Sequence, residues 1–162
     1  MDNFEELIAA IETMDPEILA GGIIFYTILF AVIVAIAAIR YLLIAIGYSR
    51  MYHKAGVAGW KAFIPVYHTY NNYKIAWNGK MFFLYAALYI LFNAIAGGTT
   101  LAMQLAAAAA GIALLVVDVK RNVKMAKLFG KGVGTGIALI LFPAITSMIL
   151  GLGKAEYTAI AE

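Results

Sequence analysis

The chain has 162 residues, of which 64% are hydrophobic and 13% are charged, and its formal net charge is +3. Soluble domains contain about 45–50% apolar and about 25% charged residues, and small proteins bury only about two thirds of their unfolded surface. This composition excludes a soluble enzyme and a nucleic-acid-binding domain. The absence of cysteine excludes disulfides and thiolate zinc sites.

The first 14 residues predict an amphipathic helix. Asp2 and Glu5 have the spacing of a capping box, and apolar side chains recur with a helical period. These apolar side chains are Phe4, Leu7, Ile8, Ile11 and Met14. Two interpretations remain open: an interfacial anchor that sets the entry angle of the next helix, or a helix for gating or docking.

Four membrane-spanning helices are expected after this segment. The first has 22 consecutive uncharged residues, more than the roughly 20 that a bilayer requires. Its start is marked by Asp15 as N-cap, by Pro16 at the first helical position and by the acid Glu17. The expected spans are residues 16–50, 81–98, 101–129 with a cytoplasmic extension that ends at Gly130, and 133–153. The predicted fold is an all-α, integral-membrane four-helix bundle.

Charge indicates the orientation of these spans. Ten of the twelve lysines and arginines lie between the first and second spans or between the third and fourth, whereas six of the nine acids precede residue 18. The positive-inside rule then predicts a multi-pass protein of the bacterial inner membrane with both termini extracytoplasmic. The ten cations orient the chain and attract the anionic lipids of the inner leaflet, and no nucleic-acid partner is expected.

The loop at residues 54–79 predicts a short helix at the cytoplasmic membrane interface. Val66, Tyr70, Tyr73 and Trp77 recur at helical spacing, and Pro65 suits the first turn. Interleaved aromatic and basic residues also occur in proteins that bind single-stranded nucleic acid. Beside membrane spans, however, amphipathic aromatic side chains favour the interfacial interpretation.

Three segments resemble a family of small bacterial multi-pass membrane proteins of unknown function, often mislabelled as signal peptidase I. The first is a KAG-xx-GW-xxx-IPxY loop, and the others are residues 129–132 and 150–157. The loop residues are Lys54, Gly56, Gly59, Trp60, Pro65 and Tyr67. His68 departs from the pattern, because the family usually has Asn there. The resemblance implies a membrane architecture and transfers no catalytic residue.

No enzymatic activity, metal or cofactor is expected. A serine–lysine peptidase needs a lysine base beside its serine and an external domain for the substrate, whereas Ser49 lies on the predicted cytoplasmic side. His53 and His68 have no cysteine and no acid near them in sequence, and a metal site needs further ligands.

Polar residues inside the predicted spans are candidate functional residues. They are Arg40, Asn93, Gln104 and Asp118. Arg40 and Asp118 reach a similar depth near the inner edge of the hydrocarbon, which predicts an ion pair between the first and third spans. Two alternatives remain open: Arg40 extends to lipid phosphates, and Asp118 pairs on its own helix with Lys120 or Arg121.

Small residues predict close helix packing. Gly132 and Gly136 have small-xxx-small spacing in the fourth span, and residues 106–111 give the third span a surface of alanine and glycine. The leading hypothesis is a non-enzymatic membrane module that self-associates or binds a membrane partner. An oligomeric pore, suggested by the intramembrane polar residues, and a small transporter component remain alternatives, although the sequence shows no convincing internal repeat.

Overall fold

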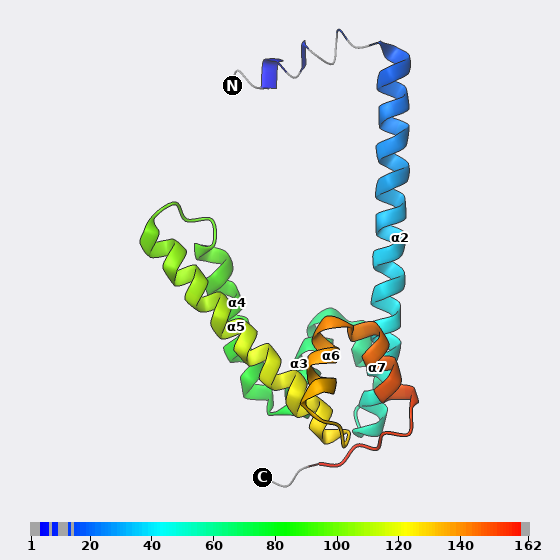
Figure 1. The fold of residues 1–162 in the computed structure, drawn as a ribbon, viewed down its shortest axis with the longest axis vertical. Coiled ribbons are helices and arrows are strands. Elements are labelled where there is room, and N and C mark those ends of the chain that lie inside the picture. Colours follow the sequence, from blue (N-terminus) through cyan, green and yellow to red (C-terminus); the bar gives the residue numbers. More distant parts are fainter. Residues whose placement is uncertain (1–3, 7, 10–12, 14, 160–162) are drawn as a thin grey trace. The chain divides into compact units, whose positions relative to one another are not determined.

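The computed structural model describes residues 4–6, 8–9, 13 and 15–159, and this part of the chain is helical and contains no strand. The elements in order are α2 (Pro16–Lys54), the 3-10 helix η1 (Gly59–Phe63), α3 (Pro65–Ala76), α4 (Gly79–Ile95), α5 (Leu101–Leu128), α6 (Val133–Leu141) and α7 (Pro143–Leu152) (Figure 1). Residues 1–40 and 41–162 form separate compact units. The predicted amphipathic helix over residues 1–14 falls largely outside the described residues.

Helix α2 begins where the sequence predicts and ends four residues later than predicted. The backbone N–H of Glu17 donates to Asp15 Oδ1 at 2.8 Å, so that Asp15 caps the helix. At the other end Gly56 has a φ of +73°, and the N–H of Val57 donates to the carbonyl oxygen of Tyr52 at 2.8 Å. Gly56 therefore provides the left-handed residue that ends α2.

Helices α4 and α5 form an antiparallel hairpin. The hydroxyl oxygen of Thr100 accepts a hydrogen bond from the N–H of Met103 and caps α5. Phe92 of α4 packs over Gly111 of α5, where an added Cβ would lie 3.4 Å from the ring. Helix α5 ends at Leu128, and Gly130, two residues later, has a φ of +66°, which confirms the predicted left-handed residue after this helix.

The predicted fourth span is divided into α6 and α7, which have 9 and 10 residues. Pro143 has no N–H to donate and its ring clashes with a continuing helix, so the helical hydrogen bonding is interrupted at Phe142. The Thr146 hydroxyl donates to the carbonyl oxygen of Ala138 across this break at 3.0 Å. Each half is only about 15 Å long, half of the roughly 30 Å hydrocarbon core. Residues 133–153 therefore do not form the one continuous helix that the sequence predicts.

Two helices, α2 and α5, are long and apolar enough to cross a membrane, judged by length and composition. In the most apolar 18-residue stretch of α2 no residue is buried, and in that of α5 11% of the residues are buried. The buried core lies instead where the C-terminal parts of α2 and α5 meet α3, α6 and α7. Its largest members are Tyr52, Tyr73, Phe129, Met51 and Leu150.

Candidate functional site

Lys54, at the C-terminal end of α2, binds the C-terminal end of α7. Its ammonium group donates to the carbonyl oxygens of Leu150 at 2.8 Å, Gly153 at 2.7 Å and Ala155 at 2.8 Å. An ammonium group has three donors, so Lys54 is fully satisfied by backbone. A cation at this position also interacts favourably with the negative end of the α7 dipole. Lys54 thus joins two of the three segments that carry the family resemblance.

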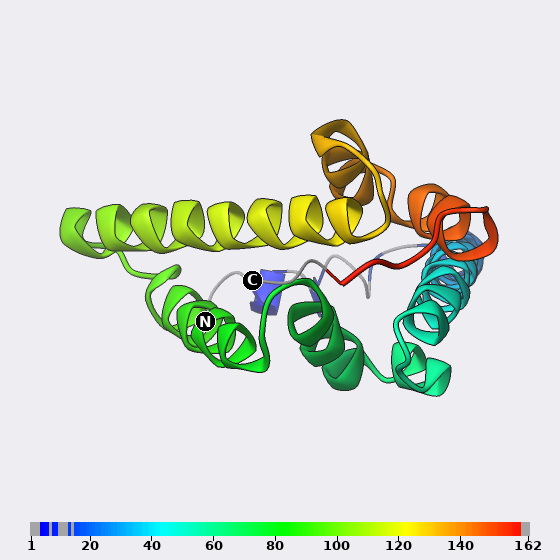
Figure 2. The ribbon, with the colours of Figure 1, turned by 90° about the horizontal axis from the view of Figure 1, so that it is seen from below.

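The C-terminal segment, residues 153–159, continues from this contact to the end of α5. The N–H of Thr158 donates to the carbonyl oxygen of Leu128 at 2.8 Å, and the rings of Phe129 and Tyr157 meet edge to face with centroids 5.7 Å apart. Figure 2 shows this segment passing between α3 and the end of α5. Residues 129–132, the remaining segment of the family resemblance, therefore begin beside the C-terminal segment.

These contacts locate the C-terminal segment relative to the two basic loops. The charge pattern predicts a C-terminal tail on the opposite side of the membrane from Lys54. The hydrogen bonds from Lys54 and to Leu128 place it at the end of the molecule that carries both basic loops. The C-terminal segment lies there because the helix is broken at Pro143. Helix α6 runs away from that end and α7 runs back to it (Figure 1).

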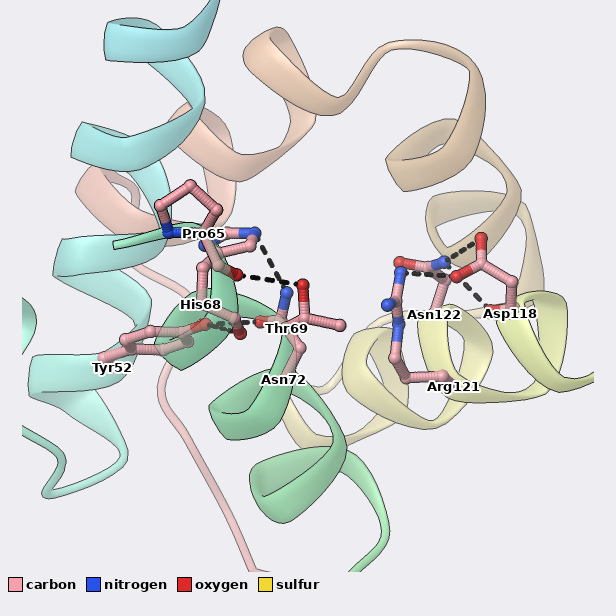
Figure 3. A network of polar contacts seen from close by, with 8 residues as sticks. All are labelled: Tyr52, Pro65, His68, Thr69, Asn72, Asp118, Arg121 and Asn122. Carbon is pink, nitrogen blue, oxygen red and sulfur yellow. Dashed lines mark hydrogen bonds and ion pairs between the residues drawn. The ribbon is translucent and has the colours of Figure 1, made fainter. Parts of the chain in front are cut away.

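A polar cluster links α2 with α3. The Tyr52 hydroxyl lies 2.7 Å from both the carbonyl oxygen of His68 and Asn72 Oδ1, and Asn72 Nδ2 lies 3.0 Å from His68 Nε2 (Figure 3). The other ring nitrogen of His68, Nδ1, is buried and has no hydrogen-bond partner. Burial, with a contribution from the nearby charge of Arg121, lowers the pKa of His68 to about 4. The imidazole is therefore neutral at physiological pH.

A second polar cluster lies on α5. Arg121 Nη2 is 2.7 Å from Asp118 Oδ1, and Asn122 Nδ2 is 3.2 Å from Asp118 Oδ2 (Figure 3). The guanidinium of Arg121 also lies over the ring of Tyr73, 5.1 Å from its centroid. Asp118 thus has a partner on its own helix, which was one of the two alternatives. Arg40 belongs to the other compact unit, and its pair with Asp118 stays a prediction.

The remaining loop residues of the resemblance have structural roles. Gly59 allows α2 to approach η1, because an added Cβ would lie 3.0 Å from the carbonyl oxygen of Ser49. Trp60 and Tyr67 form a ring pair with centroids 5.8 Å apart, and Pro65 begins α3. The loop contains the predicted helix as α3, and the position of this helix at a membrane interface stays a prediction. Trp77 ends α3 and lies under the ammonium group of Lys124, 4.3 Å from the ring centroid.

The other candidate residues are dispersed. Asn93 is exposed and donates to the carbonyl oxygen of Tyr89 on its own helix. Gln104 is exposed on α5, and its side chain has no hydrogen-bond partner among the described residues. Gly136 packs against Val123, whose Cα would lie 2.6 Å from an added Cβ, whereas Gly132 has no heavy atom within 4 Å. The close contact is therefore made by Gly136 alone.

A second close helix contact, between α2 and α7, was not predicted from the sequence. An added Cβ at Gly47 would lie 2.7 Å from the carbonyl carbon of Ser147, and Gly151 packs against the backbone of Gly47. Ser147 and Gly151 have small-xxx-small spacing, a signal that was present in the sequence. Tyr52 and Asn72 were also missed, and no local pattern distinguishes them from other interfacial residues. No three His, Asp or Glu side chains of the described residues lie together as a metal site would require.

The family described as "Family of unknown function (DUF5684)" matches residues 60–159. This match begins within the aromatic loop and includes α3 to α7 with the C-terminal segment. No curated protein and no solved structure matches the chain.

Proposed function

This chain belongs to the DUF5684 family of unknown function, and we propose that it acts as a non-enzymatic, multi-pass module of the bacterial inner membrane that associates with copies of itself. The observation that carries the proposal is the unburied apolar surface of its helices. Ile23, Phe25 and Phe30 on α2 are each more than half exposed, and α4 has no buried residue. Each Å² of such surface costs about 25 cal/mol in water, and a bilayer removes that cost.

The proposed membrane topology is supported by the charges and by the C-terminal contacts. The basic end, with Lys54 and Leu128, faces the cytoplasm under the positive-inside rule. Helices α2, α4 and α5 then cross the membrane, and α6 and α7 enter from the cytoplasmic side and return to it. In this arrangement the N-terminus is extracytoplasmic and residues 153–159 are cytoplasmic.

Self-association is supported by the outer half of α5. In residues 102–111 only Ala107 and Ala110 are buried, so most of the small side chains are exposed. Small residues allow close approach of a second helix in lipid, where association depends on packing and on interhelical hydrogen bonds. The exposed amide of Gln104 lies on the same part of α5 and supplies a donor and an acceptor for such a contact.

Disulfide cross-linking tests self-association directly, because the natural chain contains no cysteine. A single cysteine at the exposed Ala109 should form a dimer in membranes, and Gln104→Leu should reduce that dimer. A cysteine at Ala110, which is buried, is the matched control and should remain monomeric. A monomer in lipid nanodiscs, with no cross-link from Ala109 or from its exposed neighbour Ala108, would contradict the proposal.

A second candidate function is favoured by the broken helix pair α6–α7. Irregular backbone at membrane depth occurs in channels and transporters, where it is buried in protein or lines a cavity filled with water. The pair could then form part of an oligomeric pore or of a transporter. Single-channel recording of the purified protein in planar bilayers separates this function from that of a module. Stable conductance that Pro143→Ala abolishes supports a pore, and a silent bilayer contradicts it.

A further inference from the structure

One cavity at the basic end is lined by three lysines from two helices. It has a volume of about 580 Å³ and lies where the ends of α3 and α5 meet the C-terminal segment. Lys74 of α3 and Lys124 and Lys127 of α5 line it together with Trp77 and Tyr157. No acidic side chain is among the lining residues; Glu156 lines a separate hollow beside Lys154.

Among the described residues, the three ammonium groups have no counter-ion. In the part of the chain that the structure describes, none of them has a hydrogen-bond or ion-pair partner, and the acid on α5, Asp118, pairs with Arg121. Lys124 contacts the face of Trp77, which leaves its N–H donors available to a further group. Three like charges around one cavity repel each other unless an anion binds between them.

We propose that this cavity binds the phosphate group of an anionic phospholipid headgroup. The inference rests on the proposed topology, in which the cavity opens at the level of the inner-leaflet headgroups. Basic cavities between membrane helices on the cytoplasmic side bind such headgroups, and Lys binds phosphate as a point charge. Trp77 and Tyr157 supply the amphipathic rings that are typical of this depth. The site differs from the diffuse attraction of ten cations because it binds one lipid at one place.

The test uses the full chain with Trp60→Phe, which leaves Trp77 as its single tryptophan. The purified protein in detergent is titrated with phosphatidylglycerol or with phosphatidylcholine. Trp77 fluorescence is recorded, and native mass spectrometry counts the bound lipids independently. Phosphatidylglycerol should saturate at one lipid per chain, whereas zwitterionic phosphatidylcholine should not. Equal binding of both lipids would overturn the proposal.

Matched variants separate the cavity from general charge. Lys124→Gln with Lys127→Gln should weaken phosphatidylglycerol binding by about tenfold to thirtyfold, since each lysine near an anionic headgroup contributes roughly fivefold in affinity. Lys120→Gln with Lys131→Gln removes the same charge from the same loop outside the cavity and should bind as the unmodified chain does. Equal losses in both pairs would overturn the site in favour of diffuse attraction.

Lys124→Arg with Lys127→Arg keeps both charges and should retain phosphatidylglycerol binding. If the double Gln variant does not fold, the single variant Lys74→Gln on α3 should weaken this binding instead. Lysines near helix ends also interact with the terminal carbonyl groups of the helix. If that were their only role, the Gln variants would change the melting temperature without lipid and leave the selectivity for phosphatidylglycerol intact.

Displacement of the lipid by millimolar inorganic phosphate would overturn the lipid assignment in favour of a free anion. If the protein cross-links through a cysteine at position 109 but shows no lipid preference, the lipid site is overturned and the proposed self-association stands.

Discussion

The ammonium nitrogen of Lys54 lies 2.8 Å from the carbonyl oxygen of Leu150, although 96 residues separate them in the chain. Two further carbonyl groups, of Gly153 and Ala155, complete the coordination of the same ammonium group. This contact fixes the return of α7 to the end of α2. It is the reason why the C-terminal segment and the two basic loops occupy one side of the molecule.

Replacing Lys54 by Met should destabilise the protein by about 2–4 kcal/mol, because three carbonyl groups lose a charged donor at once. Thermal unfolding in detergent measures the effect. Lys80→Met, an exposed lysine at the start of α4, is the control and should change stability by less than about 0.5 kcal/mol. Equal melting temperatures for the two variants would show that the Lys54 contacts contribute no net stability.

The side of the membrane on which the C-terminal segment lies can be measured by cysteine labelling. A single cysteine at Thr158 should be protected from an impermeant thiol reagent in whole cells and should react after permeabilisation. A cysteine at Asn3 should react in whole cells and serves as the opposite control. Labelling of Thr158→Cys in intact cells would contradict the proposed topology.

Gly136→Ala should destabilise the contact between α5 and α6 by about 1–3 kcal/mol, because the added methyl meets the backbone of Val123 rather than a flexible side chain. Gly134→Ala, in the same helix, has no heavy atom within 4 Å and should be neutral or slightly stabilising. Detergent melting curves of the two variants compare the positions. A neutral Gly136→Ala would mean that α6 can move away from α5 without cost.

The stability of the protein should fall as the pH decreases from about 6.5 to 4. The pKa of His68 is lowered to about 4 in the folded chain, so the unfolded chain binds more protons in this window. At pH 5 the loss is at most about 2 kcal/mol relative to pH 7, and above about pH 7 the contribution is constant. His68→Asn should flatten this part of the profile, whereas His53→Gln, at an exposed position, should leave it unchanged.

A double-mutant cycle distinguishes the partners of Asp118. Asp118→Ala and Arg121→Ala should be coupled by about 0.5–1 kcal/mol, because the pair is only partly buried. A parallel cycle with Arg40→Ala tests the pair that the sequence predicts between the first and third spans. Coupling in that cycle would support the inter-helix pair, and strict additivity would leave Arg121 as the partner of Asp118.

Local signals in the sequence predicted the ends of the helices well. Asp15, Gly130 and the alternation of apolar stretches with basic loops each depend on a few neighbouring residues. The break at Pro143 was also local, and it was missed because the apolar composition of residues 133–153 outweighed a single proline. The site was harder to predict, since Lys54 acquires its partners only after α6 and α7 turn back. Composition indicates how apolar a segment is, but it does not indicate whether the segment forms one continuous helix or two helices that turn back.

The contacts of Lys54 can form only late in the synthesis of the chain. A ribosome that has completed residue 128 has synthesised α2 and the α4–α5 hairpin, but it has not yet made the carbonyl groups of residues 150–155. During that interval the Lys54 ammonium lacks the three carbonyl groups that bind it in the folded chain. The contact between α2 and α7 therefore forms late, and a nascent chain stalled before residue 150 should leave this end of the core exposed.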